Sequence, residues 1–253
     1  MSHWTEARTL GALLLGVLLL TGCAEQHRED LRLWTIATSS QSLLALTPES
    51  QGCDDFGYQD RQIVSIAVAS EDRVYGVDQS SHELVRLRPW GGGTERIGDI
   101  VSLAFPQSLA ASPDGSLYLL DDNRTLIRLN RDSATRIQEW LLPTGLYASL
   151  CFSPVSFTSP TRVNVSAGDL LALRQEAGNS WLILLTRVGT SVEVQDLARL
   201  SPLQSFCGSS VDGRFYALDG TRQVLELRPE AGSLRPLYDA SCALESAGPL
   251  STP

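Results

Sequence analysis

Residues 73–89 read RVYGVDQSSHELVRLRP and decide the fold. Residues 32–48 read RLWTIATSSQSLLALTP and align with this stretch without a gap. Each stretch holds two short runs rich in apolar residues on either side of a polar turn, a pattern typical of two strands joined by a turn. Two aligned copies in one chain indicate a repeat protein.

Further copies follow along the chain, at residues 116–129, 214–229 and, in a more divergent form, 169–186. A further strand is predicted after four of the copies, at residues 94–97, 136–141, 192–197 and 234–238. A strand of small residues is predicted at residues 65–67, 108–110, 149–151, 205–207 and 241–243. Four strands in a period of about 42 residues are typical of the blades of a β-propeller.

The best-preserved repeat reads SPDGSLYLLD, from Ser112 to Asp121. It resembles the repeats of the NHL and SMP-30-like propeller families, and the resemblance extends over about residues 31–248. Because such repeats occur in proteins of many unrelated functions, the resemblance implies the fold and leaves the activity open.

The two ends of the repeat region complement each other. The first copy lacks its innermost strand, and the last predicted strand, at residues 241–246, has no blade after it. We therefore predict an all-β domain over residues 31–253, a five-bladed β-propeller closed by the C-terminal strand pairing into the N-terminal blade. Closure of this kind hides the edges of the sheets.

On each predicted inner strand, a serine and an alanine or cysteine lie two residues apart and therefore face the same way. The favoured interpretation is that this small face receives the bulky face of the next blade. The alternative is a ring of hydroxyls that lines a central channel, formed by Ser65, Ser108, Ser149, Ser205 and Ser241.

Four cysteines follow Cys23 in a chain whose predicted compartment permits disulfides. Cys207 and Cys242 are expected to face each other across the closing seam, so a disulfide is predicted between them. Cys53 and Cys151 are left unassigned.

Leu20, Thr21, Gly22 and Cys23 follow an apolar run and resemble the lipobox of a bacterial lipoprotein. The run, residues 10–20, is shorter than a membrane-spanning helix needs, so residues 1–22 are predicted to be a signal peptide. The resemblance implies cleavage before Cys23, acyl chains such as palmitate on that residue, and a lipidated tether over residues 23–30. Ala24 in the next position implies the outer membrane, and we expect the domain to face the periplasm.

The composition excludes several kinds of chemistry. The net charge of −9 argues against a nucleic-acid partner. All 20 basic residues are arginines, so lysine-dependent catalysis and a P-loop are excluded. Beyond the signal peptide only His27 and His82 remain, and we expect neither a histidine-rich zinc site nor a Ser-His-Asp triad.

Three aspartates, Asp78, Asp121 and Asp219, end the second strand of their blades, where the turn to the third strand begins. The favoured interpretation is that each carboxylate accepts hydrogen bonds from turn amides. The alternative is a ligand-binding rim, calcium being one possible ligand, that also includes His82, Asp122, Asn123 and Glu176. SMP-30-like lactonases hold a divalent metal at this mouth, but their ligands have no counterparts on the predicted inner strands here, so a metal site stays undefined.

We predict a membrane-anchored, non-catalytic binding or scaffolding module of the bacterial envelope. It needs no cofactor, and its partner is an envelope protein or a small-molecule or glycan ligand. No residue is assigned a catalytic role. The alternative is a metal-dependent hydrolase of lactones or glycosides; a glycosidase would need a pair of carboxylates from among Asp60, Asp99, Asp239 and Glu245. Trp90 and residues 152–161 are candidate partner contacts.

Overall fold

The computed structural model describes residues 31–37, 40–70, 73–89, 93–122, 124–240 and 250–251. These residues form strands and turns without a helix, which confirms the all-β prediction. Within them, no helical segment has the length and hydropathy required to cross a bilayer. They belong to one compact unit, Leu31–Pro253. The predicted signal peptide, Cys23 and the tether lie outside the described residues.

The repeats fold into short antiparallel sheets that resemble propeller blades. The first sheet contains β1 (Leu33–Ala37), β2 (Ser42–Thr47) and β3 (Gly52–Tyr58). The second contains β4 (Ile63–Ser70), β5 (Arg73–Asp78), β6 (Glu83–Leu87) and β7 (Thr94–Asp99). The last contains β18 (Ser205–Gly208), β19 (Phe215–Leu218), β20 (Gln223–Arg228) and β21 (Ser233–Asp239).

Two further groups of four strands lie between these sheets in the sequence. One consists of β8 (Pro106–Ala111), β9 (Leu117–Asp121), β10 (Thr125–Leu129) and β11 (Arg136–Leu141). The other consists of β12 (Leu146–Phe152), β15 (Leu170–Glu176), β16 (Asn179–Val188) and β17 (Ser191–Leu200), with a small hairpin, β13 (Phe157–Thr158) and β14 (Asn164–Val165), inserted after β12. One parallel pairing, Leu141 with Ser191, joins the two groups into an eight-stranded sheet.

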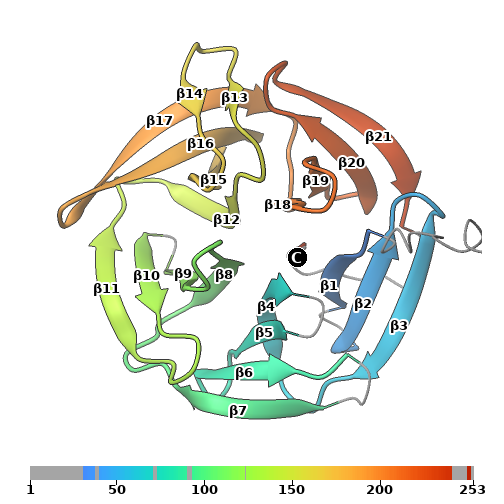
Figure 1. Cartoon of the computed structure of the whole chain (residues 1–253), viewed down its shortest axis with the longest axis vertical. Coiled ribbons are helices and arrows are strands. Elements are labelled where there is room, and N and C mark those ends of the chain that lie inside the picture. Colours follow the sequence, from blue (N-terminus) through green and yellow to red (C-terminus); the bar gives the residue numbers. More distant parts are fainter. Residues whose placement is uncertain are drawn as a thin grey trace, which may run out of the picture. The chain divides into compact units, whose positions relative to one another are not determined.

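The hydrophobic core lies between neighbouring sheets. Leu171 and Leu182 of one group pack in the same cluster as Phe206 and Phe215 of the last sheet. A sheet that is covered on both faces needs apolar residues on both faces, which explains why every residue of β9 is buried. Figure 1 shows the sheets around a common centre, with β4, β8, β12 and β18 closest to it; we call these the inner strands.

Buried serines join each inner strand to the next one. The Ser65 hydroxyl accepts a hydrogen bond from the Leu109 amide at 2.6 Å, and the Ser108 hydroxyl accepts one from the Leu150 amide at 2.9 Å. Ser149 continues the pattern, because the Phe206 amide lies 3.4 Å from its hydroxyl.

These three serines, Ser65, Ser108 and Ser149, are at most 1% exposed. The small face therefore packs against the next sheet, as the favoured interpretation has it. The alternative of a channel lined by these hydroxyls is wrong for all three, because each hydroxyl is buried against a neighbouring strand.

The described C-terminal residues contact both the first and the last sheet. The Leu250 amide donates to the Ser205 hydroxyl at 3.2 Å, and the Ser251 hydroxyl accepts from the Val68 amide at 2.9 Å. Ser251 also pairs with Trp34 of β1 as an antiparallel bridge, with backbone hydrogen bonds of 2.6 and 2.8 Å. The predicted strand at residues 241–246, Ser241 included, lies outside the described residues.

The predicted Cys207–Cys242 disulfide is wrong, because Cys207 carries a buried thiol. Cys53, left unassigned from the sequence, is disulfide-bonded. Cys53 on the outer strand β3 and Cys207 on the inner strand β18 pack in one apolar cluster. Cys242 lies outside the described residues.

Part of the predicted contact stretch at residues 152–161 serves the core instead. The ring of Phe157 packs edge-on against Phe215 of the last sheet, with 5.8 Å between the ring centroids. Thr161 donates from its hydroxyl to the backbone carbonyl of Asp196 at 2.7 Å. The insertion is therefore fixed to two neighbouring groups of strands. The other candidate contact, Trp90, lies outside the described residues.

We expect Ser108→Ala to lower the free energy of unfolding by about 1–3 kcal/mol, because it leaves the buried Leu150 amide without its acceptor. Urea unfolding measures the change. Ser133→Ala is the matched control, since the Ser133 side chain is exposed and its hydroxyl hydrogen-bonds to the exposed hydroxyl of Thr135. Equal stabilities of the two variants would contradict the role given to the inner serines.

Candidate functional site

The links between consecutive sheets lie against the turns that join second and third strands. The Gln59 amide donates to the Gln41 carbonyl at 2.8 Å in the first sheet, and the Ile100 amide donates to the His82 carbonyl at 2.9 Å in the second. The same contact recurs near the last sheet, where Ala240 bonds to Arg222 at 3.1 Å. We call the face formed by these links and turns the connection face. All the predicted rim residues that the structure describes lie in these turns or at their ends.

Each of the three predicted aspartates is used within its own turn or link. Asp121 accepts from the Phe105 amide at 2.6 Å and from the Ala104 amide at 3.0 Å. Asp219 accepts from the Thr221 amide at 2.8 Å. Asp78 accepts from the Ser80 amide at 2.9 Å. These hydrogen bonds agree with the interpretation of the aspartates as acceptors for turn amides.

The other rim residues that the structure describes do not form a metal site with the aspartates. His82 and Asp122 occupy turn positions with φ values of 56° and 48°. Glu176 is exposed and lies 3.6 Å from the Arg174 guanidinium. Asn123 lies outside the described residues. In the described part of the chain, no three His, Cys, Asp or Glu side chains come together to hold a metal ion.

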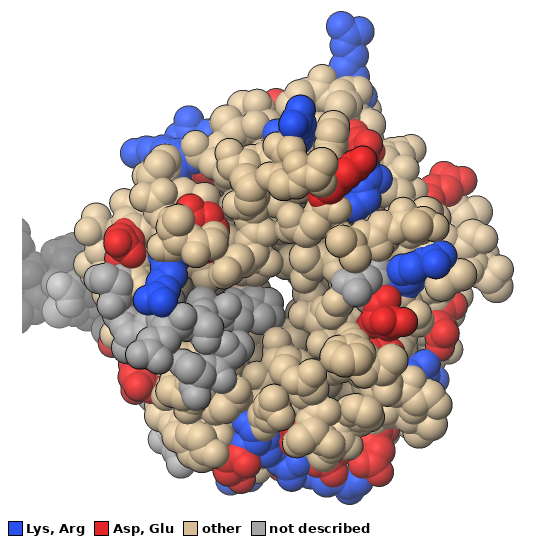
Figure 2. Space-filling view, turned by 180° about the vertical axis from the view of Figure 1, so that it is seen from behind, with Lys and Arg blue, Asp and Glu red and all other residues tan. Residues whose placement is uncertain are grey.

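A central cavity of about 190 Å³ lies between the inner strands. Its lining includes Leu109, Leu150, Cys151, Cys207 and Ser251, and none of the described lining residues is Asp, Glu, Arg or His. Burial raises the pKa of the Cys151 thiol, so this group stays neutral. Figure 2 draws the molecule from behind the view of Figure 1 and shows a narrow central opening. Most charged side chains on the face drawn there lie toward its outer part. The cavity therefore offers apolar contact and little acid–base chemistry.

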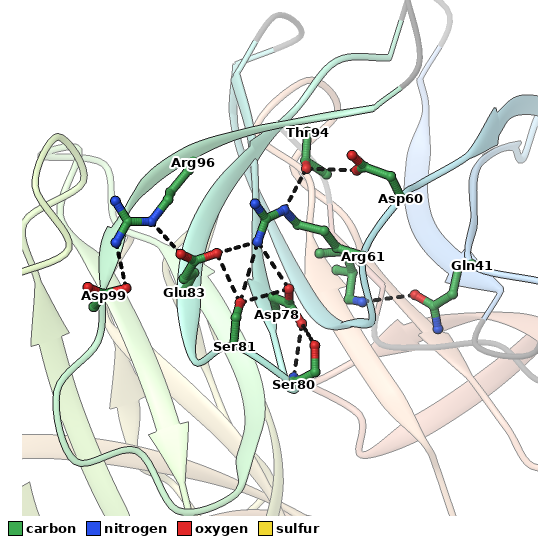
Figure 3. A network of polar contacts seen from close by, with 11 residues as sticks. Gln41, Asp60, Arg61, Asp78, Ser80, Ser81, Glu83, Thr94, Arg96 and Asp99 are labelled. Atoms are coloured by element: carbon green, nitrogen blue, oxygen red, sulfur yellow. Dashed lines mark hydrogen bonds and ion pairs between the residues drawn. The ribbon is translucent and has the colours of Figure 1, made fainter.

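A polar network centred on Arg61 lies on the connection face between the first two sheets (Figure 3). Arg61 belongs to the link between β3 and β4. Its Nη1 atom contacts Asp78 Oδ2 at 3.2 Å and forms a second ion pair with Glu83. Its Nε atom donates to the Thr94 hydroxyl at 3.0 Å, and that hydroxyl donates to Asp60 Oδ1 at 2.8 Å.

The network continues along β6 and β7. Glu83 accepts a hydrogen bond from Arg96, and Arg96 also donates to Asp99 at 2.7 Å. On the other side, the Ser81 hydroxyl donates to Asp78 Oδ2 at 2.8 Å. One guanidinium thus joins a link, a turn and an outer strand, which fixes the local shape of the connection face.

The environment keeps both central carboxylates ionised. Burial by itself would raise the pKa of Asp78, but hydrogen bonds from Ser80, Ser81 and Arg61 outweigh it and lower the pKa. Burial likewise acts to raise the pKa of Glu83, and hydrogen bonds from Arg96, Ser81 and Arg61 again produce a net lowering. A general acid or base works best with a pKa near the working pH, and these two shifts move the carboxylates away from it.

An open cleft of about 460 Å³ adjoins the network, and we call it the network cleft. Its size falls within the range of small-molecule sites. Tyr58, which is 66% exposed, forms part of its wall. The other lining residues carry amide, carboxylate, guanidinium and hydroxyl groups: Gln41, Asp60, Arg61, Gln62, Asp78, Ser80 and Ser81.

Sequence reasoning selected Asp78 and missed its partners Arg61 and Glu83. These two residues come from a link and from the start of a third strand, and the topology brings them to the turn after β5. The sequence feature that could have indicated this network is the pair Asp60 and Arg61, two opposite charges just before the apolar inner strand β4.

No model of a protein family matches this sequence, and no curated protein matches it. Among solved structures, a chain from the crystal structure of a nidogen–laminin complex is similar, with 18% identity and a TM-score of 0.53; the match covers 88% of this chain and 82% of that one. The X-ray structure of a provisionally assigned gluconolactonase is similar as well, with 16% identity, a TM-score of 0.51, and coverage of 83% and 73%. At these identities the similarities show the β-propeller fold alone.

The lowered pKa values of Asp78 and Glu83 predict an acid-sensitive contribution to stability. A carboxyl whose pKa falls on folding stabilises the fold above its unfolded-state pKa, and this contribution is lost as the pH falls through the folded-state pKa. We expect the urea midpoint of the wild type to drop between about pH 5 and pH 3 more steeply than that of Asp78→Asn.

The exposed Asp132→Asn serves as the control for this measurement and should follow the wild type. Parallel pH profiles for the wild type and Asp78→Asn would show that the Arg61 network does not stabilise the ionised carboxylate.

Proposed function

We propose that this chain is a five-bladed β-propeller lipoprotein that acts as a non-catalytic binding or scaffolding module. The proposal of a non-catalytic role is supported by the Arg61 network, in which Arg61 already forms ion pairs with Asp78 and Glu83 beside an open cleft. Such a site holds fixed charges and hydroxyls for contact, and its carboxylates are poorly placed for proton transfer at neutral pH.

Two observations support five blades and closure by the C-terminal segment. The described strands fall into five groups along the chain, the first with three strands and each of the others with four in the repeat order. Ser251 pairs with Trp34, where the first group lacks its innermost strand. The same two C-terminal residues, Leu250 and Ser251, bond to Ser205 and Val68 of the sheets on either side.

The lipobox-like residues 20–23 support the anchored location. Acylation of Cys23 with two or more chains would hold the protein stably on the outer membrane, where one chain would not. Anchoring would raise the effective concentration of the module for other components of the envelope. We place the propeller in the periplasm, with an envelope protein or a small-molecule or glycan ligand as its partner.

We expect Cys23→Ala in the full-length chain to abolish metabolic labelling with palmitate and to move at least ten times more protein into the soluble fraction, because the acyl attachment site is lost. Glu25→Gln, in the predicted tether, should leave both readouts unchanged. Cell fractionation and labelling measure the effect.

Retention of Cys23→Ala on the membrane with undiminished labelling would contradict the anchor. A separate result would contradict the non-catalytic assignment: turnover of a lactone or an aryl glycoside by the purified protein that is lost in Asp121→Ala.

A further inference from the structure

The walls of the network cleft are held together by hydrogen bonds between separate parts of the chain. The Gln59 amide donates to the Gln41 carbonyl at 2.8 Å, and the Gln79 amide donates to the Gln62 carbonyl at 2.9 Å. The Gln41 side chain also accepts from the Ile63 amide at 2.8 Å. The turn at Gln41, the link before β4 and the turn after β5 are therefore fixed relative to one another, and the cleft is a preorganised feature of the fold.

Tyr58 presents an aromatic ring to this cleft because the strand that carries it is irregular. The pairing of β2 with β3 shifts its register just before Tyr58, which leaves one extra residue in β3. Gly57 takes a φ of 90° at this point. Phe56 packs against Trp34, with 5.0 Å between the ring centroids, whereas Tyr58 is 66% exposed. Irregularities of this kind redirect side chains and are frequent beside functional sites.

The carboxylate of Asp78, at the floor of the network, has no acceptor position left for a ligand. Its Oδ1 atom accepts from the amide and the hydroxyl of Ser80, at 2.9 and 2.7 Å. Its Oδ2 atom accepts from the Ser81 hydroxyl at 2.8 Å and from Arg61 Nη1 at 3.2 Å. An ionised carboxylate offers about four acceptor positions, and here all of them are used. Asp78 is therefore unsuited to holding a metal ion or an ammonium group.

The remaining charges disfavour an anion. The charged side chains among the described lining residues are Asp60, Asp78 and Arg61, so carboxylates outnumber guanidinium groups. Arg61 already forms ion pairs with Asp78 and Glu83. An anionic ligand would meet unpaired negative charge without gaining a new cation. These charges favour a neutral ligand.

The groups that stay available in the cleft are mainly hydrogen-bond acceptors. Asp60 Oδ1 accepts from the Thr94 hydroxyl, and Oδ2 has no partner among the described residues. The Gln62 side chain donates from Nε2 to Gln79, which leaves its carbonyl oxygen as an acceptor. The Ser80 hydroxyl donates to Asp78, so its oxygen can accept as well. In the view of Figure 3, Asp60 and Gln41 lie on one side of Arg61 and Glu83 on the other.

We propose that the network cleft binds a neutral saccharide. One C–H face of the sugar ring lies against Tyr58, and the sugar hydroxyls donate to Asp60, Gln62 and Ser80. A tyrosine suits this contact because its ring is rigid and amphipathic and loses little conformational entropy on binding. This inference rests on the proposed function of a non-catalytic binding module and adds the chemical class of its ligand.

Saturation-transfer difference NMR with the purified full-length chain is the first test. The neutral probes are glucose, galactose, mannose and N-acetylglucosamine, each as the free sugar and as an oligosaccharide. The charged probes are glucuronate and glucosamine. We expect a neutral probe to bind, with the strongest transfer to the C–H protons of one ring face, and the charged probes to show no transfer. Tighter binding of the oligosaccharide identifies the end of a glycan as the ligand, and equal affinities identify the free sugar.

Titration calorimetry with the tightest neutral probe then measures the contribution of the cleft. We expect Tyr58→Ala to raise Kd about tenfold, and Tyr58→Phe, which keeps the ring, to stay within about threefold of the wild type. Gln62→Ala should raise Kd about threefold through the lost acceptor. Phe105→Ala is the matched control and should leave Kd unchanged, because Phe105 is 62% exposed and lies outside the cleft lining. All four variants should unfold at the wild-type temperature, since the changed side chains are exposed.

The proposal is overturned if no neutral probe binds, if Tyr58→Ala binds like the wild type, or if glucuronate or glucosamine binds more tightly than the neutral sugars. Binding that requires calcium would overturn it as well, because the Asp78 carboxylate is already saturated. Turnover of an aryl glycoside that is lost in Asp121→Ala would instead refute the non-catalytic role in the proposed function.

Discussion

The fold depends on a hydrogen bond from the backbone of one inner strand to a buried serine of its neighbour. An inner strand is an edge strand, so the amides on its open side have no partner in their own sheet. Ser65, Ser108 and Ser149 supply the missing acceptors from the adjacent sheet. A serine suits this position because it is small enough for close approach of two backbones and still carries an oxygen.

Because the inner strands are packed against one another through these buried serines, the polar and charged groups lie mainly in the links and turns at one end of the sheets. The aspartates there fix the links, as Asp121 does through the amides of Ala104 and Phe105. Arg61 does the same between the first two sheets through Asp78 and Glu83. The network cleft therefore lies beside side chains whose positions are fixed by ion pairs and hydrogen bonds.

Much of the fold could be predicted from the sequence because it depends on local patterns. The strand pairs, the small residues of the inner strands and the aspartates of the turns follow from alternation, residue size and turn chemistry. The role of Ser251 could not be predicted, because proline stands two residues after it, where the predicted inner strands have alanine or cysteine. Arg61 and Glu83 were also missed, since their pairing arises only where a link and a turn from separate parts of the sequence meet.

Native-state hydrogen exchange at the bonded inner-strand amides tests the central claim most directly. These amides belong to Leu109, Leu150, Phe206, Leu250 and Val68. If serines link the inner strands into a closed ring, all five should exchange only through global unfolding, with the same dependence on denaturant. Exchange of Val68 and Leu250 through local opening, while the other three stay protected, would show that the C-terminal residues do not close the ring.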